Sequence, residues 1–112
     1  MKSTQLGEFE ELVLLIIGAL GDDAYSISIK NEFKTKTGRN PSIGALHSAF
    51  NRLEKKGFLE SEFGEATAIR GGKRKRFYKV TPYGKKALES VMETRKKLWE
   101  AIPNVAFDFK FA

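Results

Sequence analysis

The 112-residue chain contains no cysteine. This absence excludes disulfides, thiolate metal sites and thiol-based redox sensing, and it is consistent with a reducing cytoplasm, where we expect the protein to act. Histidine occurs once, at His47. A single histidine cannot build a metal site or a Ser-His-Asp constellation unaided, so we predict neither.

Other features of enzymes and membrane proteins are missing as well. No pair of carboxylates lies at helical spacing beside a base, and no glycine-rich phosphate loop follows a predicted strand. The longest apolar run, 12–17, is far too short to span a bilayer, and the acidic residues before it are unlike a secretory signal. We therefore expect a protein that is not an enzyme, needs no cofactor and does not bind a membrane.

The composition is that of one small, basic domain. With 41% hydrophobic and 30% charged side chains, 112 residues can bury a single modest core and leave no room for a second catalytic domain. Lysine and arginine number 20 against 14 acidic residues, which gives a net charge of +6. A field of this sign favours a polyanionic partner such as nucleic acid, or an anionic membrane surface.

The positive charge is concentrated in RGGKRKRFYK, residues 70–79, where six basic and two aromatic side chains occur without an acid. The residues that follow, 80–84, read as the end of a strand, a helix cap and the start of a helix. We therefore interpret the basic run as the tip of a β-hairpin that lies against a polyanion, and we disfavour a disordered basic arm.

The first helix is predicted over 8–20, closed by Gly21. Leu14 and Leu15 lie off its main apolar stripe, which indicates that the helix is apolar on more than one side and that a partner subunit covers the second side. The stripe itself comprises Phe9, Leu12, Val13, Ile16, Ile17 and Leu20.

Two further helices are predicted before the hairpin. The second carries an apolar repeat at Tyr25, Ile29 and Phe33 and ends at Gly38. The third is capped by Ser42 and ends at Gly57. We expect its inward side to hold Ile43, Leu46, Phe50 and Leu53, and its outward side Gly44, Ser48, Asn51, Arg52 and Lys55, with His47 at the border.

The outward side of the third helix is small, polar and basic. Such a surface suits the DNA major groove, because small residues allow close approach while Asn and Arg can bond base edges. Taken alone, the helix favours an ordinary solvated surface. For His47, a solvated or packing role is favoured over a base or phosphate contact by about three to two.

The rest of the chain completes a winged-helix layout. Strands are predicted around 58–63 and 74–80, joined by a loop over 65–73, and Tyr78 is expected in the core. The fold class is mainly α with one small β-hairpin. We predict three parts: a winged-helix DNA-binding domain with its N-terminal helix over 1–81, a dimerisation helix over 82–102 and a tail over 103–112.

The last helix begins with Thr81 as cap and Pro82 at its first position. Its apolar residues have nearly heptad spacing, interrupted by Arg95, which favours pairing with a second copy. These residues are Leu88, Val91, Met92, Leu98, Trp99 and Ile102.

In the tail, phenylalanines at 107, 109 and 111 alternate with other residues, so we expect the tail to pack on the dimer or on a sheet edge. A frayed end is the competing interpretation.

Four segments together resemble the PadR-like transcriptional regulators, over residues 7–98. They are EELVLLIIGAL, AYSISIKNEF, SIGALHSAFNRLEKKGFLES and KRKRFYKVTPYGKKAL. The resemblance implies a homodimeric winged-helix regulator, usually a repressor, that binds operator DNA. Two positions depart from the family pattern, since His47 replaces a usual tyrosine and Ala24 a usual glycine.

Position by position, the resemblance implies two groups of DNA-binding residues, to which the outward side of the third helix adds Lys55. The first group is Ser42, Gly44, Ala45, His47, Ser48, Asn51 and Arg52, and the second is Lys73, Arg74, Lys75 and Arg76.

Some family members hold a drug-like aromatic ligand between aromatic residues at the dimer interface, and Trp99 lies in the corresponding helix of this chain. A plain interface anchor is favoured for Trp99 by about two to one. A winged-helix module that binds protein or RNA is the alternative function.

Overall fold

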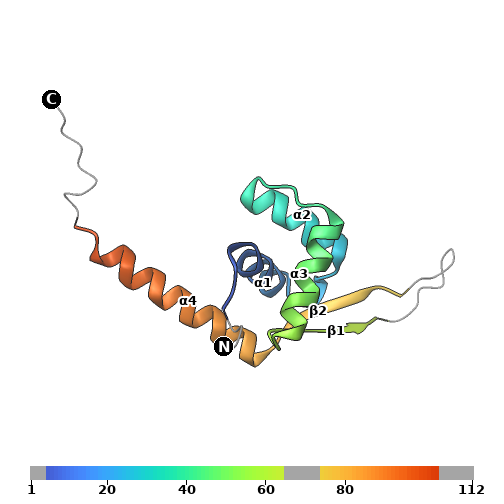
Figure 1. Cartoon of the computed structure of the whole chain (residues 1–112). Coiled ribbons are helices and arrows are strands. Elements are labelled where there is room, and N and C mark those ends of the chain that lie inside the picture. The colour runs from blue at the N-terminus through green and yellow to red at the C-terminus, as the bar shows by residue number, and fades with distance from the viewer. Residues whose placement is uncertain (1–4, 65–73, 104–112) are drawn as a thin grey trace.

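The computed structural model describes residues 5–64 and 74–103. The first three α-helices pack together beside a two-stranded hairpin, and the last α-helix leads away from them (Figure 1). The helices are α1 (Glu8–Leu20), α2 (Ser26–Thr37), α3 (Ile43–Lys55) and α4 (Pro82–Ala101), and the antiparallel strands are β1 (Leu59–Phe63) and β2 (Arg76–Val80). The predicted fold class, mainly α with a β-hairpin in winged-helix order, is confirmed. Lys73, the wing loop and the tail phenylalanines lie outside the described residues.

The helix ends are fixed by the caps that the sequence predicts. The Ser42 hydroxyl accepts a hydrogen bond from the Ala45 amide at 3.0 Å, and the Thr81 hydroxyl accepts one from the Gly84 amide at 2.9 Å. Gly38 ends α2 in a left-handed conformation with φ of 77°. Such a conformation is strained for residues with a Cβ, so glycine is favoured at this position.

The core lies between α1, α2, α3 and the hairpin. Its largest fully buried side chains are Phe33, Phe50 and Phe58. Tyr78 of β2 is buried as predicted, and its ring lies 4.3 Å from that of Phe50 in α3. This contact joins the hairpin to the third helix, so the two elements predicted to bind nucleic acid belong to one packed unit.

The predicted surroundings of two helix residues, Leu14 and Ile43, are wrong. Leu14, expected at a dimer interface, is fully buried in the core of its own subunit, whereas Leu15 is partly exposed. The reason is that α1 is central: α2, α3, β2 and α4 all contact it and cover more than one of its sides. Ile43, expected inward, is 37% exposed, because it occupies the first position of α3, where the helix projects beyond the core.

The hairpin continues past the end of its regular strands. β1 and β2 pair in a register that places Ser61 opposite Tyr78 and Phe63 opposite Arg76. Regular β2 begins at Arg76, two residues later than predicted, but the Gly64 amide still donates to the Lys75 carbonyl at 2.7 Å. The paired backbone therefore reaches the basic residues of the wing.

The first turn of α4 is locked against the end of α3. The Thr81 hydroxyl donates to the Gly57 carbonyl at 2.6 Å, and a Cβ at Gly84 would clash with the backbone of Phe58. From this anchor α4 extends away from the other helices (Figure 1). Within residues 5–64 and 74–103, no helix combines the length and the hydropathy needed to cross a membrane.

Candidate nucleic-acid interface

One side of α3 is exposed along the whole helix. Its inner side is buried through Leu46, Ala49, Phe50 and Leu53. The exposed side contains every residue of the predicted recognition surface, namely Ser42, Gly44, Ala45, His47, Ser48, Asn51, Arg52 and Lys55. The small side chains cluster in the first two turns, so a ligand can approach the backbone of α3 most closely there.

The turn that leads into α3 is held by α2. The Lys30 ammonium donates to the Asn40 side-chain carbonyl at 2.9 Å and to the Pro41 backbone carbonyl at 2.5 Å. Because Ser42 follows directly and caps α3, these bonds fix where the helix begins. The amino-terminal end of α3 is thus oriented by contacts within the subunit.

His47 has neighbours on two sides although it is exposed. Its Nε2 lies 3.0 Å from the Ser26 hydroxyl at the start of α2, and its ring stands edge-on to Phe50 at 5.2 Å. The two contacts hold the imidazole against α2 and the core ring of Phe50, and the choice between a packing role and a DNA contact stays a prediction. They also place the first turn of α2 next to the exposed side of α3, a neighbour that spacing along the sequence does not reveal.

Arg52 is engaged within the subunit. Its Nε donates to Glu10 of α1 at 2.6 Å, and Lys56 donates to the same carboxylate at 2.7 Å. Burial would raise the pKa of Glu10, but these two hydrogen bonds and one from the Gly7 amide outweigh it and lower that pKa. Half of the Arg52 side chain remains exposed, so it anchors α3 to α1 while keeping a surface for an outside contact.

The described wing cations are all exposed, and each lies beside an aromatic ring. Arg74 and Arg76 lie over the ring of Phe63, with Cζ at 5.6 Å and 4.9 Å from its centroid. Lys75 lies over the ring of Tyr25, with Nζ at 4.1 Å. At these distances a cation is attracted to the ring face, so Arg74 and Arg76 are held by the hairpin and Lys75 by the residue that caps α2.

The two faces of the hairpin differ in charge. Paired residues share a face, so Ser61, Phe63, Arg76 and Tyr78 lie on one, while Glu60 and Glu62 lie on the other with Phe77 and Lys79. The first face is the one turned toward α3, because Tyr78 packs on Phe50. On the other face the two glutamates offset the charge of Lys79, so the net positive charge of the hairpin lies on the face toward α3.

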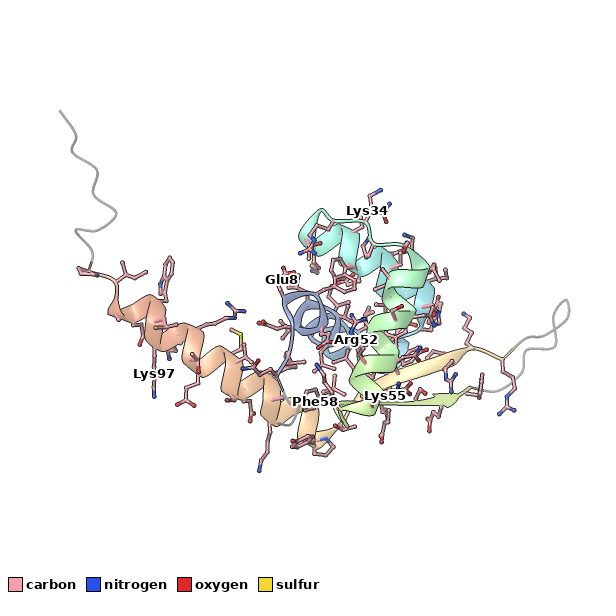
Figure 2. The ribbon with its side chains drawn as sticks, viewed as in Figure 1. Glu8, Lys34, Arg52, Lys55, Phe58 and Lys97 are labelled. Atoms are coloured by element: carbon pink, nitrogen blue, oxygen red, sulfur yellow. The ribbon has the colours of Figure 1, made fainter. Side chains whose placement is uncertain are left out.

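The cationic face and the exposed side of α3 are therefore adjacent parts of one subunit. Figure 2 shows Lys55 at the end of α3 beside the hairpin and Arg52 on the side of α3 toward α1, with Lys97 far along α4. The Ser61 hydroxyl donates to Glu54 of α3 at 2.7 Å and fixes the hairpin against the helix. The exposed polar residues of α3 and the exposed arginines of the wing therefore belong to one packed unit.

Several residues that shape this surface were not singled out in the sequence. The sequence predicts Phe63 only as a strand residue and Tyr25 only as part of an apolar repeat, and it gives no signal for Ser26 or Glu10. The spacing of Phe63 and the wing arginines could have indicated a cross-strand pair, but only with the register known. For Ser26 and Glu10 no local pattern exists, because their partners are 21 and 42 residues away.

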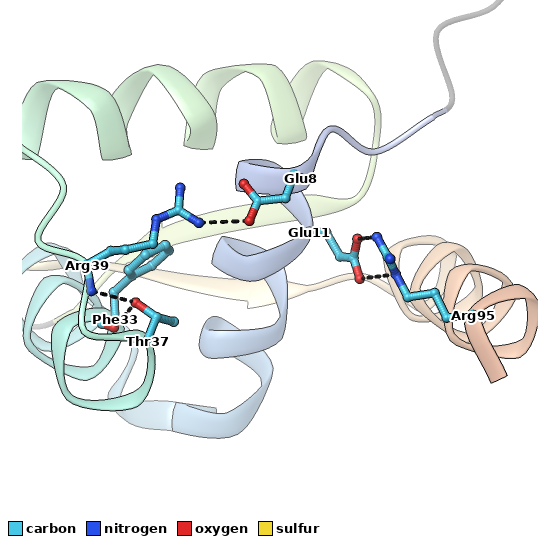
Figure 3. Close-up of polar contacts among 6 residues, drawn as sticks. All are labelled: Glu8, Glu11, Phe33, Thr37, Arg39 and Arg95. Atoms are coloured by element: carbon cyan, nitrogen blue, oxygen red, sulfur yellow. Dashed lines mark hydrogen bonds and ion pairs between the residues drawn. The ribbon is translucent and has the colours of Figure 1, made fainter. Parts of the chain in front are cut away.

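A separate apolar surface lies along α4. Met92, Leu98, Trp99 and Ile102 are exposed there, and with Leu88 they line a shallow groove. Val91, predicted on the same seam, lines a different groove beside Leu6, Phe58 and Tyr83. Arg95, which interrupts the seam, makes two hydrogen bonds to Glu11 of α1, at 2.8 Å and 3.2 Å (Figure 3).

Known proteins match nearly the whole of this arrangement. The transcriptional regulator PadR-like family matches residues 13–90. An uncharacterized protein of Lysinibacillus sphaericus is 32% identical over 98 residues, which are 86% of this chain and 85% of that protein.

Solved structures match at the level of the fold. A PadR-like transcription factor from Bacteroides fragilis superposes with a TM-score of 0.70 at 24% identity, over 82% of this chain and 84% of that one. A transcriptional regulator from Clostridium thermocellum superposes with a TM-score of 0.63 at 29% identity, over 84% and 89%. These structures share the arrangement of helices and hairpin described above.

Proposed function

The chain belongs to the transcriptional regulator PadR-like family, and we propose that it is a dimeric, sequence-specific DNA-binding repressor. In this proposal α3 enters the major groove, the wing contacts phosphates on the flanking backbone, and α4 pairs with its counterpart in a second subunit. Small side chains at the start of α3 permit close approach, and Asn51 offers hydrogen bonds to base edges.

The adjacency of the exposed side of α3 and the cationic face of the hairpin carries the proposal. An ordinary solvated helix needs no second basic element beside it. Here the face toward α3 holds Arg74 and Arg76, and the glutamates of β1 lie on the other face. This distribution of charge supports contact with a polyanion on the α3 side.

The proposed dimer rests on the exposed apolar side chains of α4. Leu98 and Trp99 are 65% and 68% exposed, which is costly in water and is relieved when a second α4 covers them. A twofold dimer would place two copies of α3 on a palindromic operator. Trp99 is proposed as an interface anchor, beside which a planar aromatic effector would bind if the regulator is relieved by a small molecule.

The test begins with selection of genomic fragments that the full chain binds at physiological salt. Affinity for a selected duplex is then measured against salt concentration for the parent and for a variant with Lys73, Arg74, Lys75 and Arg76 changed to glutamine. We expect the slope of log affinity against log salt to flatten by roughly 0.9 for each phosphate that the wing no longer neutralises.

The control carries the same change of charge away from the wing, at exposed Lys34, Lys36, Lys86 and Lys97. Its slope should stay closer to that of the parent. An unchanged slope in the wing variant would mean that the wing points away from DNA. Recovery of no fragment, or tighter binding to RNA, would favour the RNA-binding or protein-binding alternative.

A further inference from the structure

Phe63 is unusual among the large apolar side chains of the hairpin because it is 52% exposed and lies beyond the core. Phe58, Leu59 and Tyr78 of the same region are buried. An exposed phenylalanine on a strand of five residues gains little from burial. Its contacts therefore have to explain what it contributes.

The ring of Phe63 is shared by two guanidinium groups. Arg76 lies directly opposite it in the register, with Cζ 4.9 Å from the ring centroid, and Arg74 approaches the same ring at 5.6 Å. A planar guanidinium can stack on an aromatic face, whereas an ammonium is a compact, strongly hydrated charge. Arginine at both positions is suited to this contact.

Each arginine is also held by one hydrogen bond from its Nε. Arg74 Nε donates to the Gly64 carbonyl at 2.9 Å, and Arg76 Nε donates to the Ser61 hydroxyl at 3.0 Å. Neither forms an ion pair with a carboxylate within residues 5–64 and 74–103. The Nη groups of both arginines carry the remaining N–H donors. Within the described residues these groups make no hydrogen bond, so they can donate to an acceptor on another molecule.

We propose that Phe63 is a positioning residue whose ring, with the two Nε hydrogen bonds, holds Arg74 and Arg76 ready to bind backbone phosphates of duplex DNA. The inference rests on the proposed function and assigns this chain a residue that contributes to affinity without carrying charge. Pre-organisation lowers the side-chain entropy lost when a long basic side chain is fixed on a phosphate. A simple cross-strand contact that stabilises the hairpin is the competing role.

The first measurement uses the free protein. Side-chain NMR resonances of Arg74 and Arg76 should show upfield ring-current shifts that disappear in Phe63→Leu and persist in Phe63→Tyr. Unshifted resonances in the parent would overturn the inference and leave the proposed function untouched.

The second measurement is affinity for a duplex selected from the genome by the parent. We expect Phe63→Leu to weaken binding roughly tenfold in a dimer with two wings, and Phe63→Tyr to restore it. Tyr83→Leu is the matched control, since Tyr83 is 51% exposed on α4 and contacts Phe58. It should bind as the parent does.

The two roles of Phe63 separate in a variant that lacks both arginines. In Arg74→Gln/Arg76→Gln, adding Phe63→Leu should change affinity less than twofold, because no guanidinium remains to be positioned. A further tenfold loss there would assign Phe63 to hairpin stability and overturn the inference. A parent that binds no duplex would overturn the proposed function itself, and that result is visible before any variant is made.

Discussion

At the scale of single residues, close contacts explain side chains that composition leaves ambiguous. Gly84 lies where α4 begins, and an added Cβ would meet the Phe58 carbonyl group. Gly44 lies on the exposed side of α3, where a Cβ would meet only the Ser42 hydroxyl at 3.9 Å. The two helical glycines therefore differ. Gly84 allows α4 to pack against the Phe58 backbone, whereas Gly44 keeps the exposed side of α3 open to a molecule that approaches it.

We expect Gly84→Ala to destabilise the fold by about 1–3 kcal/mol, because α4 must shift to relieve the overlap with the Phe58 backbone. Gly44→Ala should instead stabilise it by up to about 1 kcal/mol through helix propensity, while weakening binding to DNA. Urea unfolding followed by circular dichroism measures both. Equal stability changes of the same sign would contradict this account of the two positions.

At the scale of elements, neighbouring acidic residues of α1 bind two different helices. Glu10 holds Arg52 of α3 and Lys56, which caps the end of that helix, whereas Glu11 holds Arg95 of α4. A further pair, Arg39 with Glu8 at 2.7 Å, ties the end of α2 to the start of α1 (Figure 3). Both α3 and α4 are therefore positioned against α1, whose residues are not among those proposed to bind DNA.

The buried pair at Glu10 predicts a pH-dependent stability. Its pKa is lowered in the folded state from the ordinary value of 4.5, so the stabilisation is present above that value and is lost as the pH falls through the lower, folded value. Glu10→Gln should cost about 1–3 kcal/mol at pH 7 and progressively less below about pH 4.

The control is Glu32→Gln, which breaks a partly exposed pair with Lys36 at 3.7 Å and should cost under about 0.5 kcal/mol. Urea titrations of both variants at several pH values give the comparison. If the loss of stability in Glu10→Gln does not change with pH, the negative charge of Glu10 does not contribute to the stability of the fold.

At the scale of the whole molecule, α4 packs its first apolar residues, including Leu88, against the core and exposes the later ones, including Leu98 and Trp99. Its first turn is locked to Gly57 and Phe58, and Arg95 holds its middle against α1. In the proposed dimer these contacts would set the direction of α4 relative to α3. They would therefore set the distance between the two recognition helices, which must match the spacing of the operator half-sites.

Leu98→Glu should convert the proposed dimer into a monomer of 12.6 kDa. The new carboxylate would be buried only at the interface between two chains, which is costly. Because Leu98 is exposed in the single chain, the variant should still fold. Sedimentation equilibrium measures the mass, and circular dichroism the helix content. Ile27→Glu, a similarly exposed apolar position on α2, should keep the parent's mass. A parent that sediments as a monomer would contradict the dimer.

Local patterns in the sequence determined the elements of this protein. Helical periodicity, the caps at Ser42 and Thr81, and the glycines at 38 and 57 placed the helices within one or two residues, because these interactions are formed by residues close together in the chain. The basic run and the turn-flanked strands determined a hairpin. The segments that resemble the PadR-like regulators identified the family.

Only the tertiary structure decided which surfaces are free. It buried Leu14, exposed Ile43, joined Arg52 to Glu10 and placed Phe63 beneath two arginines. Spacing along a helix or strand says which residues share a side, but not which neighbour covers that side. That choice depends on packing between elements distant in the chain, so the candidate DNA surface was predicted as a list of residues and acquired its internal contacts only on folding.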